Sequence, residues 1–156
     1  MASTLDHIDL RILKALQEDS SISNIDLARK IKLSPSPTLA RVKSLEASKV
    51  ITRYVALVDP PALGLKMNVF IQVSLEKQES AALLTFEKAV RDFDEIMEVY
   101  LMTGDADYLL RVVVPDIQAL ERFILDHLTH VPGIKNIRSS FALKQVKYRT
   151  ALPIAD

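Results

Sequence analysis

The chain has 156 residues, of which 49% are hydrophobic and 26% charged, and its 20 Lys and Arg balance its 20 Asp and Glu. This composition, with only three glycines, excludes a disordered chain, and the length allows one domain or two small ones. Cysteine is absent, which excludes disulfides and thiol chemistry; with no apolar run long enough for a bilayer and no signal-peptide layout, we expect a cytoplasmic protein without membrane contact.

Two short helices are predicted first. The stretch Leu5–Asp9 opens one of them, with acids in its first turn, and Asp19–Ser21 ends it. Its apolar face consists of Ile8, Ile12, Leu13 and Leu16. The second helix has Ser23 as its N-cap, followed by Asp26 three residues later.

A third helix is predicted after the segment Leu33–Pro37, with Ser36 as its N-cap and Pro37 in its first turn. Its buried stripe is expected to consist of Leu39, Val42 and Leu45. The opposite face carries Ser36, Ala40 and Ser44, flanked by Arg41 and Lys43. Small and polar residues beside two cations can approach the floor of a DNA major groove.

The charge distribution supports this interpretation. Between Arg29 and Arg53, seven Lys and Arg face a single acid, Glu46, so this stretch carries +6 in a chain that is neutral overall. Residues 1–60 carry +2 and residues 61–156 carry −2, so only the first part has an electrostatic reason to meet nucleic acid. A merely solvated helix is the alternative, and the helix-turn-helix pattern argues against it.

The next segment, Val50–Leu57, is rich in β-forming residues and leads into Asp59–Pro61. We expect a wing or a linker strand that can pair with a second copy of the chain, and a domain boundary at the paired prolines. The expected ranges are 1–52 for the helix-turn-helix domain, 53–64 for the linker and 65–156 for a second domain.

The second domain is predicted to fold as β-α-β-β-α-β, the ferredoxin-like arrangement, so the chain is of the α+β class. The expected strands are 68–75, 96–102, 108–114 and 137–143, and the expected helices are 80–93 and 116–130. One sheet face takes both helices. The other face is too apolar for solvent, which indicates a dimer formed through it; its residues are Phe70, Tyr100, Met102, Leu109 and Val113.

The turn Gly104–Tyr108 is the candidate ligand site of this domain, because it places a glycine, two carboxylates and an aromatic between two strands. An ordinary hairpin turn is the alternative. His127 and His130 lack a third ligand nearby, so a metal site is not expected. No nucleophile–base pair, phosphate loop or catalytic carboxylate pair is present, so we do not expect an enzyme or a cofactor.

Several short motifs occur at a characteristic spacing. In the first half they are Leu5–Asp9, Ile22–Asn24, Leu33–Pro37, Arg41–Glu46 and Val50–Ile51. In the second half they are Thr103–Gly104, Asp107–Val112, Pro132–Gly133 and Ser139–Phe141. Through these motifs the chain resembles the Lrp/AsnC family of transcriptional regulators over essentially its whole length, and the resemblance has structural and functional implications. It implies a winged helix-turn-helix domain, a ligand-sensing domain (the RAM domain), an amino-acid effector, and dimers that assemble further, often to octamers.

We therefore expect a double-stranded DNA-binding regulator. The residues expected at DNA are Ser34, Ser36, Pro37, Thr38, Ala40, Arg41, Lys43, Ser44, Lys49 and Arg53. Arg41 is the expected guanine contact, and Arg29, Lys32, Lys49 and Arg53 are the expected phosphate contacts. The resemblance further implies an effector site formed by Tyr100, Thr103, Gly104, Asp105, Asp107 and Tyr108.

Two alternatives stay open at this point. One is a metabolite-binding module whose helical domain meets protein rather than DNA, and the other is a small enzyme on the ferredoxin-like domain. The effector, the operator and the direction of regulation do not follow from the residues.

Overall fold

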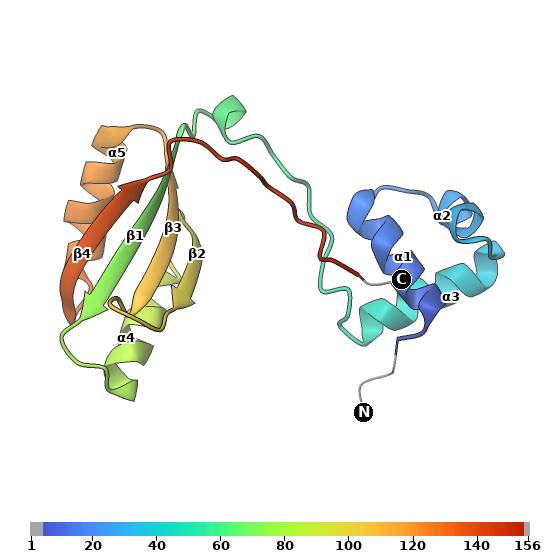
Figure 1. The fold of residues 1–156 in the computed structure, drawn as a ribbon, viewed down its shortest axis with the longest axis horizontal. Helices are drawn as coiled ribbons and strands as arrows, with labels where there is room; N and C mark the ends of the chain where they lie inside the picture. The colour runs from blue at the N-terminus through green and yellow to red at the C-terminus, as the bar shows by residue number, and fades with distance from the viewer. Residues whose placement is uncertain (1–4, 155–156) are drawn as a thin grey trace. The chain divides into compact units, whose positions relative to one another are not determined.

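The computed structural model describes residues 5–154 and divides into two compact units (Figure 1). One unit contains the described residues up to Leu57 together with those from Val146 onward, and the other runs from Val58 to Gln145. This grouping differs from the expected ranges at the C-terminal end, where the last segment joins the helical unit instead of the sheet.

The helical unit contains α1 (His7–Glu18), α2 (Asn24–Ile31) and α3 (Pro35–Ala47). Asp6 caps α1 by accepting hydrogen bonds from the backbone of Ile8 and Asp9, and the Asp9 carboxylate accepts one from the Asp6 backbone. Ser23 caps α2 as predicted, by accepting from the Asp26 backbone. The three helices bury one small core of Ile12, Ala15, Leu27, Ile31 and Leu45.

Two details of α3 differ from the prediction. The N-cap is Ser34, with Pro35 at the first helical position, so the assignment of Ser36 as the cap is wrong. The buried stripe includes Thr38, which is 0% exposed, whereas Leu39 is 43% exposed. Thr38 can be buried because its hydroxyl donates to the Ser34 carbonyl 2.9 Å away, which satisfies the polar group inside the helix.

The linker strand expected over Val50–Leu57 is not present within the chain. Residues 52–59 belong to no helix or strand, and a 3-10 turn follows at Pro61–Leu63. A strand requires a hydrogen-bonding partner, and a single copy of the chain provides none for this segment.

The second unit is a four-stranded antiparallel sheet with the order β2-β3-β1-β4 (Figure 1). Its strands are β1 (Met67–Leu75), β2 (Ile96–Leu101), β3 (Tyr108–Val114) and β4 (Ile134–Phe141). The helices are α4 (Ser80–Val90) and α5 (Ile117–Arg122), and α5 continues as a π-helical turn, Phe123–His127, and a 3-10 turn, Leu128–His130. The element order confirms the predicted ferredoxin-like fold, although α4 ends three residues early and β4 begins three residues before its predicted start.

Side chains alternate between the two faces of this sheet. Val69, Ile71 and Val73 are fully buried in a core that includes Phe86 of α4 and Leu120 of α5. The other face, which we call the open face, carries the intervening β1 positions and their cross-strand partners on β3 and β4. Within residues 5–154, no helix is long and apolar enough to cross a membrane.

Candidate DNA-binding surface and ligand pocket

The exposed side of α3 carries five of the residues predicted at DNA. Ser36, Pro37, Ala40, Lys43 and Ser44 are all exposed, and four of them, Ser36, Ala40, Lys43 and Ser44, follow one another at helical spacing. Thr38 does not belong to this surface, because its side chain is buried against the rest of the unit. The prediction of a DNA contact by Thr38 is therefore wrong, since a buried side chain cannot reach a base.

The seven cations between Arg29 and Arg53 fall into two groups. The first group is paired with acids. Arg29 lies 2.7 Å from Asp26, and Lys30 lies 2.7 Å from Glu18. Arg41 lies 2.7 Å from Asp6 and 2.8 Å from Asp9. Within the described part of the chain, no ion pair involves the second group, which is Lys32, Lys43, Lys49 and Arg53. All four are exposed, so the charge available for phosphates is concentrated on them.

Arg41 is held by the start of α1. Its Nη1 donates to Asp6 Oδ2 and to Asp9 Oδ1, and the backbone of Asp9 together with this guanidinium holds the pKa of Asp6 below its usual value. The same carboxylates raise the pKa of Arg41. The geometry opposes the prediction that Arg41 reads a guanine, because its Nη1 already binds two carboxylates that only tertiary folding brings to it.

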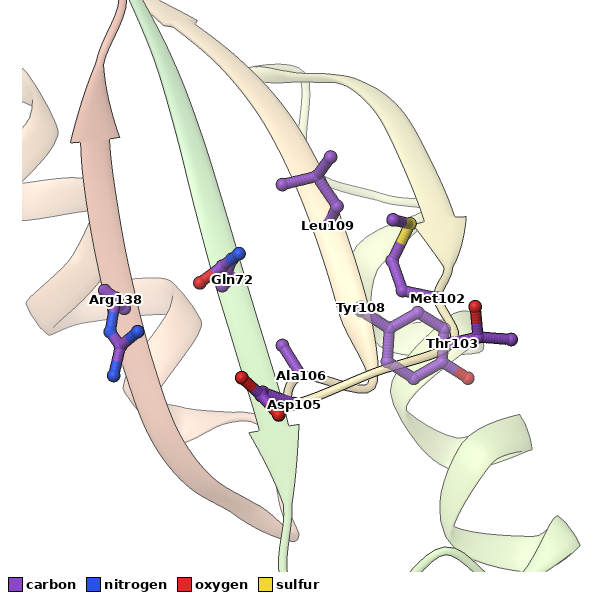
Figure 2. A pocket seen from close by; sticks show the side chains of 8 residues that line it. All are labelled: Gln72, Met102, Thr103, Asp105, Ala106, Tyr108, Leu109 and Arg138. Carbon is purple, nitrogen blue, oxygen red and sulfur yellow. The ribbon is translucent and has the colours of Figure 1, made fainter.

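A cavity of about 180 Å³ opens on the second unit beside the β2–β3 turn (Figure 2). Its lining is formed by residues of three strands, β1, β3 and β4, and by the β2–β3 turn. The lining residues are Gln72, Met102, Thr103, Asp105, Ala106, Tyr108, Leu109 and Arg138.

The lining combines opposite charges with apolar groups. Asp105 provides a carboxylate from the turn, and Arg138 provides a guanidinium from β4 (Figure 2). Gln72 lies on β1 directly opposite Arg138 in the strand register, and the cavity is closed on its other side by Met102 and Leu109. This arrangement can bind a small molecule that carries both charges and an apolar part.

Asp107 lies in the predicted site but has a structural role. Its two carboxylate oxygens accept hydrogen bonds from the Leu75 backbone and from Gln78 Nε2, both at 2.7 Å, and its side chain is 9% exposed. Asp107 does not line the cavity. The carboxylate ties the β2–β3 turn to the end of β1, and its role as an effector contact stays a prediction.

Tyr108 lines the cavity, in agreement with the prediction, but its side chain also has a structural role. Its ring is buried on the helix-covered face, 4.5 Å from the Phe86 ring, and its hydroxyl donates to Glu87. Burial and the Glu87 carboxylate raise the pKa of Tyr108 to about 12. The phenol therefore stabilises the core, although the residue contributes to the cavity wall.

The two remaining predicted residues lie outside the lining. Tyr100 is 51% exposed and donates its hydroxyl to Glu98, and Gly104 takes φ +125° at the turn, a conformation that favours glycine. Gln72 and Arg138 were missed, because they are 66 positions apart in the sequence and adjoin only through β1–β4 pairing. In the described part of the chain, no three His, Cys, Asp or Glu side chains gather as a metal site.

Comparison with known proteins identifies both units. The profile of the winged helix-turn-helix DNA-binding family matches residues 5–52, and that of the Lrp/AsnC ligand binding domain matches residues 68–152. The chain is 48% identical to the Bkd operon transcriptional regulator of Pseudomonas aeruginosa, over 96% of this chain and 98% of the relative. It is 37% identical to the leucine-responsive regulatory protein of Escherichia coli (strain K12), over 96% of this chain and 92% of the relative.

Solved structures agree with these relatives. A transcriptional regulator from Neisseria meningitidis in complex with L-Met superposes with a TM-score of 0.92 at 38% identity, covering 96% of this chain and 97% of the other. An AsnC family transcriptional regulator from Agrobacterium tumefaciens gives a TM-score of 0.91 at 42% identity, with the same coverage. Both units and their order are thus accounted for, and this chain belongs to the Lrp/AsnC family of DNA-binding transcriptional regulators with a ligand-binding domain.

Proposed function

We propose that the protein senses an α-amino acid in the cavity beside the β2–β3 turn and that the bound ligand changes its assembly and its affinity for DNA. The observation that carries this proposal is that one small cavity has both a carboxylate, Asp105, and a guanidinium, Arg138, in its lining. An α-amino acid carries an ammonium group and a carboxylate at neutral pH. The two protein side chains offer one complementary charge to each.

The remaining lining suits an uncharged ligand side chain. Met102 and Leu109 provide apolar surface, whereas Gln72 and Thr103 provide hydrogen-bonding groups. The volume of 180 Å³ lies below the range of about 300–1,000 Å³ for drug-sized ligands, which favours a ligand as small as a single amino acid. The L-Met complex of the Neisseria relative and the leucine-responsive regulator of Escherichia coli support this ligand class.

We place the protein on DNA as a dimer that presents two copies of α3 to successive major grooves. A symmetric dimer requires a roughly palindromic site with half-sites about 10–10.5 base pairs, or a multiple of that, apart. Ser36, Ala40, Lys43 and Ser44 face the bases in this arrangement. Lys32, Lys49 and Arg53 hold phosphates and set the salt dependence.

The ligand acts by preferring one assembly over another. It shifts the equilibrium only by its differential affinity for the two states, so an effector that binds both equally leaves DNA binding unchanged. We propose that the two states are a dimer and an octamer assembled from dimers, and that the protein acts in the cytoplasm.

Isothermal titration calorimetry of the full chain against single amino acids tests the ligand site. Arg138→Gln and Asp105→Asn are each expected to weaken binding at least tenfold, because each leaves one ligand charge unpaired. Arg122→Gln is the matched control, since Arg122 is an exposed arginine on α5 outside the cavity. Unchanged binding in both cavity variants places the ligand elsewhere, and no binding of any amino acid contradicts the sensor.

A gel shift against the DNA upstream of the protein's own gene tests the DNA site. We expect specific bands that weaken with salt and change when the bound amino acid is added. Specific bands that do not change with any amino acid would indicate a regulator without this effector. Absence of salt-sensitive binding to every promoter tested would contradict the DNA arrangement described above.

A further inference from the structure

The first turn of α1 and the middle of α3 share a closed network of hydrogen bonds. Asp6 Oδ1 accepts from the Ile8 and Asp9 backbone, and Asp9 Oδ2 accepts from the Asp6 backbone at 3.2 Å. The other two oxygens, Asp6 Oδ2 and Asp9 Oδ1, both accept from Arg41 Nη1. All four carboxylate oxygens of the helix cap are thereby used, two for capping and two for α3.

This network is more shielded than the other ion pairs of the unit. The side chains of Asp9, Arg41 and Asp6 are 16%, 32% and 44% exposed. Those of Lys30 and Glu18 are 48% and 58% exposed, and those of Arg29 and Asp26 are 76% and 53% exposed. Partly buried, geometrically fixed pairs cost more to break than exposed ones, because the remaining partner keeps an unpaired charge. Lys43, two residues along α3, has no such partner within the described residues.

We infer that Arg41 is a positioning residue: it holds α3 against the capped start of α1 and supports DNA binding through the orientation of Ala40, Lys43 and Ser44. The inference rests on the proposed placement of α3 in the major groove. Arg41 touches protein and not DNA, so the acids that hold it are needed for tight binding.

If Arg41 contacts DNA, neutralising the acids that bind it should raise the specific DNA affinity. If Arg41 positions α3, the same substitution should lower that affinity. Neutralising an acid near the DNA surface strengthens binding when that acid only repels phosphates or competes for a DNA-contacting arginine. When the acid holds α3 in place, the same substitution weakens specific binding. Asp9→Asn keeps the side-chain shape and an acceptor for the cap, so it is the variant of choice.

The experiment measures the affinity of the full-length protein for the duplex identified by gel shift and for a scrambled duplex, at several salt concentrations. The proteins are wild type, Asp9→Asn, Arg41→Ala and the double variant, all at a temperature where circular dichroism shows each to be folded. We expect each single variant to weaken specific binding about tenfold, which is about 1.4 kcal/mol, with scrambled binding unchanged. The double variant is expected to lose little more than either, because both substitutions break one interaction.

The salt dependence separates positioning from contact. Arg41→Ala is expected to keep the wild-type slope, whereas Arg53→Ala, at a proposed phosphate contact, reduces it by about 0.9, the value for one lost phosphate contact. Glu18→Gln is the charge-matched control on α1, because its partner Lys30 lies on α2, and it is expected to leave specific affinity unchanged or slightly tighter. The DNA affinity of Glu18→Gln shows the effect of removing one negative charge from α1 without disturbing the Arg41 network.

Tighter specific binding by Asp9→Asn, a reduced slope in Arg41→Ala or additive losses in the double variant would each overturn the positioning role. These results leave the proposed function intact, because they require a wild-type protein that binds its site. A wild-type protein without specific binding overturns both the proposed function and this inference.

Discussion

Polar residues of this chain show how tertiary packing redirects side chains that a sequence pattern places at a site. Asp107, Tyr108 and Thr38 are polar residues in or beside predicted binding motifs, and all three are buried with hydrogen-bond partners. A buried polar group is stable only when such a partner is present. Their role is to fix the turn, the core and the helix on which the proposed contact residues lie.

Asp105 and Asp107 form a natural pair for testing this division of roles. Asp107→Asn is expected to lower the unfolding free energy of the second unit by about 1–3 kcal/mol, because either the buried Leu75 amide or the part-buried Gln78 side chain loses its acceptor. Asp105→Asn is expected to leave stability within about 0.5 kcal/mol, since Asp105 is exposed, while weakening ligand binding. Urea unfolding and calorimetry on both variants check this, and equal stability of the two would argue against the anchoring role.

The raised pKa of Tyr108 predicts that the folded state loses stability at alkaline pH. Its pKa is raised to about 12 in the fold, against about 10 in an unfolded chain, so the folded state holds the proton more tightly. This contribution is complete below about pH 10 and is lost as the pH rises towards 12. Denaturation followed from pH 9 to 12 is expected to show this loss in the wild type and a smaller one in Tyr108→Phe; identical profiles would contradict it.

At the scale of elements, the helical unit consists of more than its three helices. The C-terminal segment returns to it, and Gln17 of α1 binds the backbone of Leu152 on both sides: its Oε1 accepts from the Leu152 amide at 2.6 Å, and its Nε2 donates to the carbonyl at 3.3 Å. The sequence after β4 shows no hydrophobic periodicity that would predict this. The amide of a Gln side chain can hydrogen-bond an extended backbone that shows no hydrophobic periodicity, because it offers both a donor and an acceptor.

Gln17→Ala is expected to release this segment. Hydrogen–deuterium exchange at the Leu152 amide should become several-fold faster, because the bond that protects it is lost while the segment stays otherwise exposed. Arg11→Ala, at an exposed position on the same helix, is the control and should leave the exchange rate unchanged. An unchanged rate in Gln17→Ala would show that the two hydrogen bonds do not hold the segment.

At the scale of the whole molecule, the open face of the sheet is the surface that a second copy would cover. Phe70 and Leu109 lie on it, Tyr100 and Met102 are 51% and 44% exposed, and Asn68 Oδ1 at its end is buried with no hydrogen-bond partner among the described residues. Exposed apolar side chains beside an unsatisfied acceptor are typical of an interface. We therefore keep the predicted dimer through this face as a proposal.

Phe70→Glu tests the dimer. A carboxylate at the centre of the open face would be buried without a partner, so the variant is expected to sediment as a monomer at concentrations where the wild type is a dimer. Leu84→Glu is the control, because Leu84 is 65% exposed on α4, away from this face. Sedimentation velocity of both variants checks the assignment, and a dimeric Phe70→Glu would reject this face.

Local signals alone determined most of the fold. The acids of the first helical turn, the cap Ser23 and the prolines after Leu33 mark the helices, and the alternation along residues 68–75 and 108–114 marks the central strands, because each signal depends on residues only a few positions apart. The turn at Gly104 and the basic stretch were visible for the same reason.

Only the tertiary structure decided which of the candidate residues remain available for binding. Arg41 meets Asp6 across 35 positions, Asp107 meets Leu75 across 32, and Arg138 joins the cavity through the pairing of β4 with β1. Nothing in the local pattern distinguishes a cation that is free for DNA from one held by a distant acid. The helix and strand periods could be predicted from the sequence, but the partners of its charged side chains depend on contacts that exist only once the chain has folded.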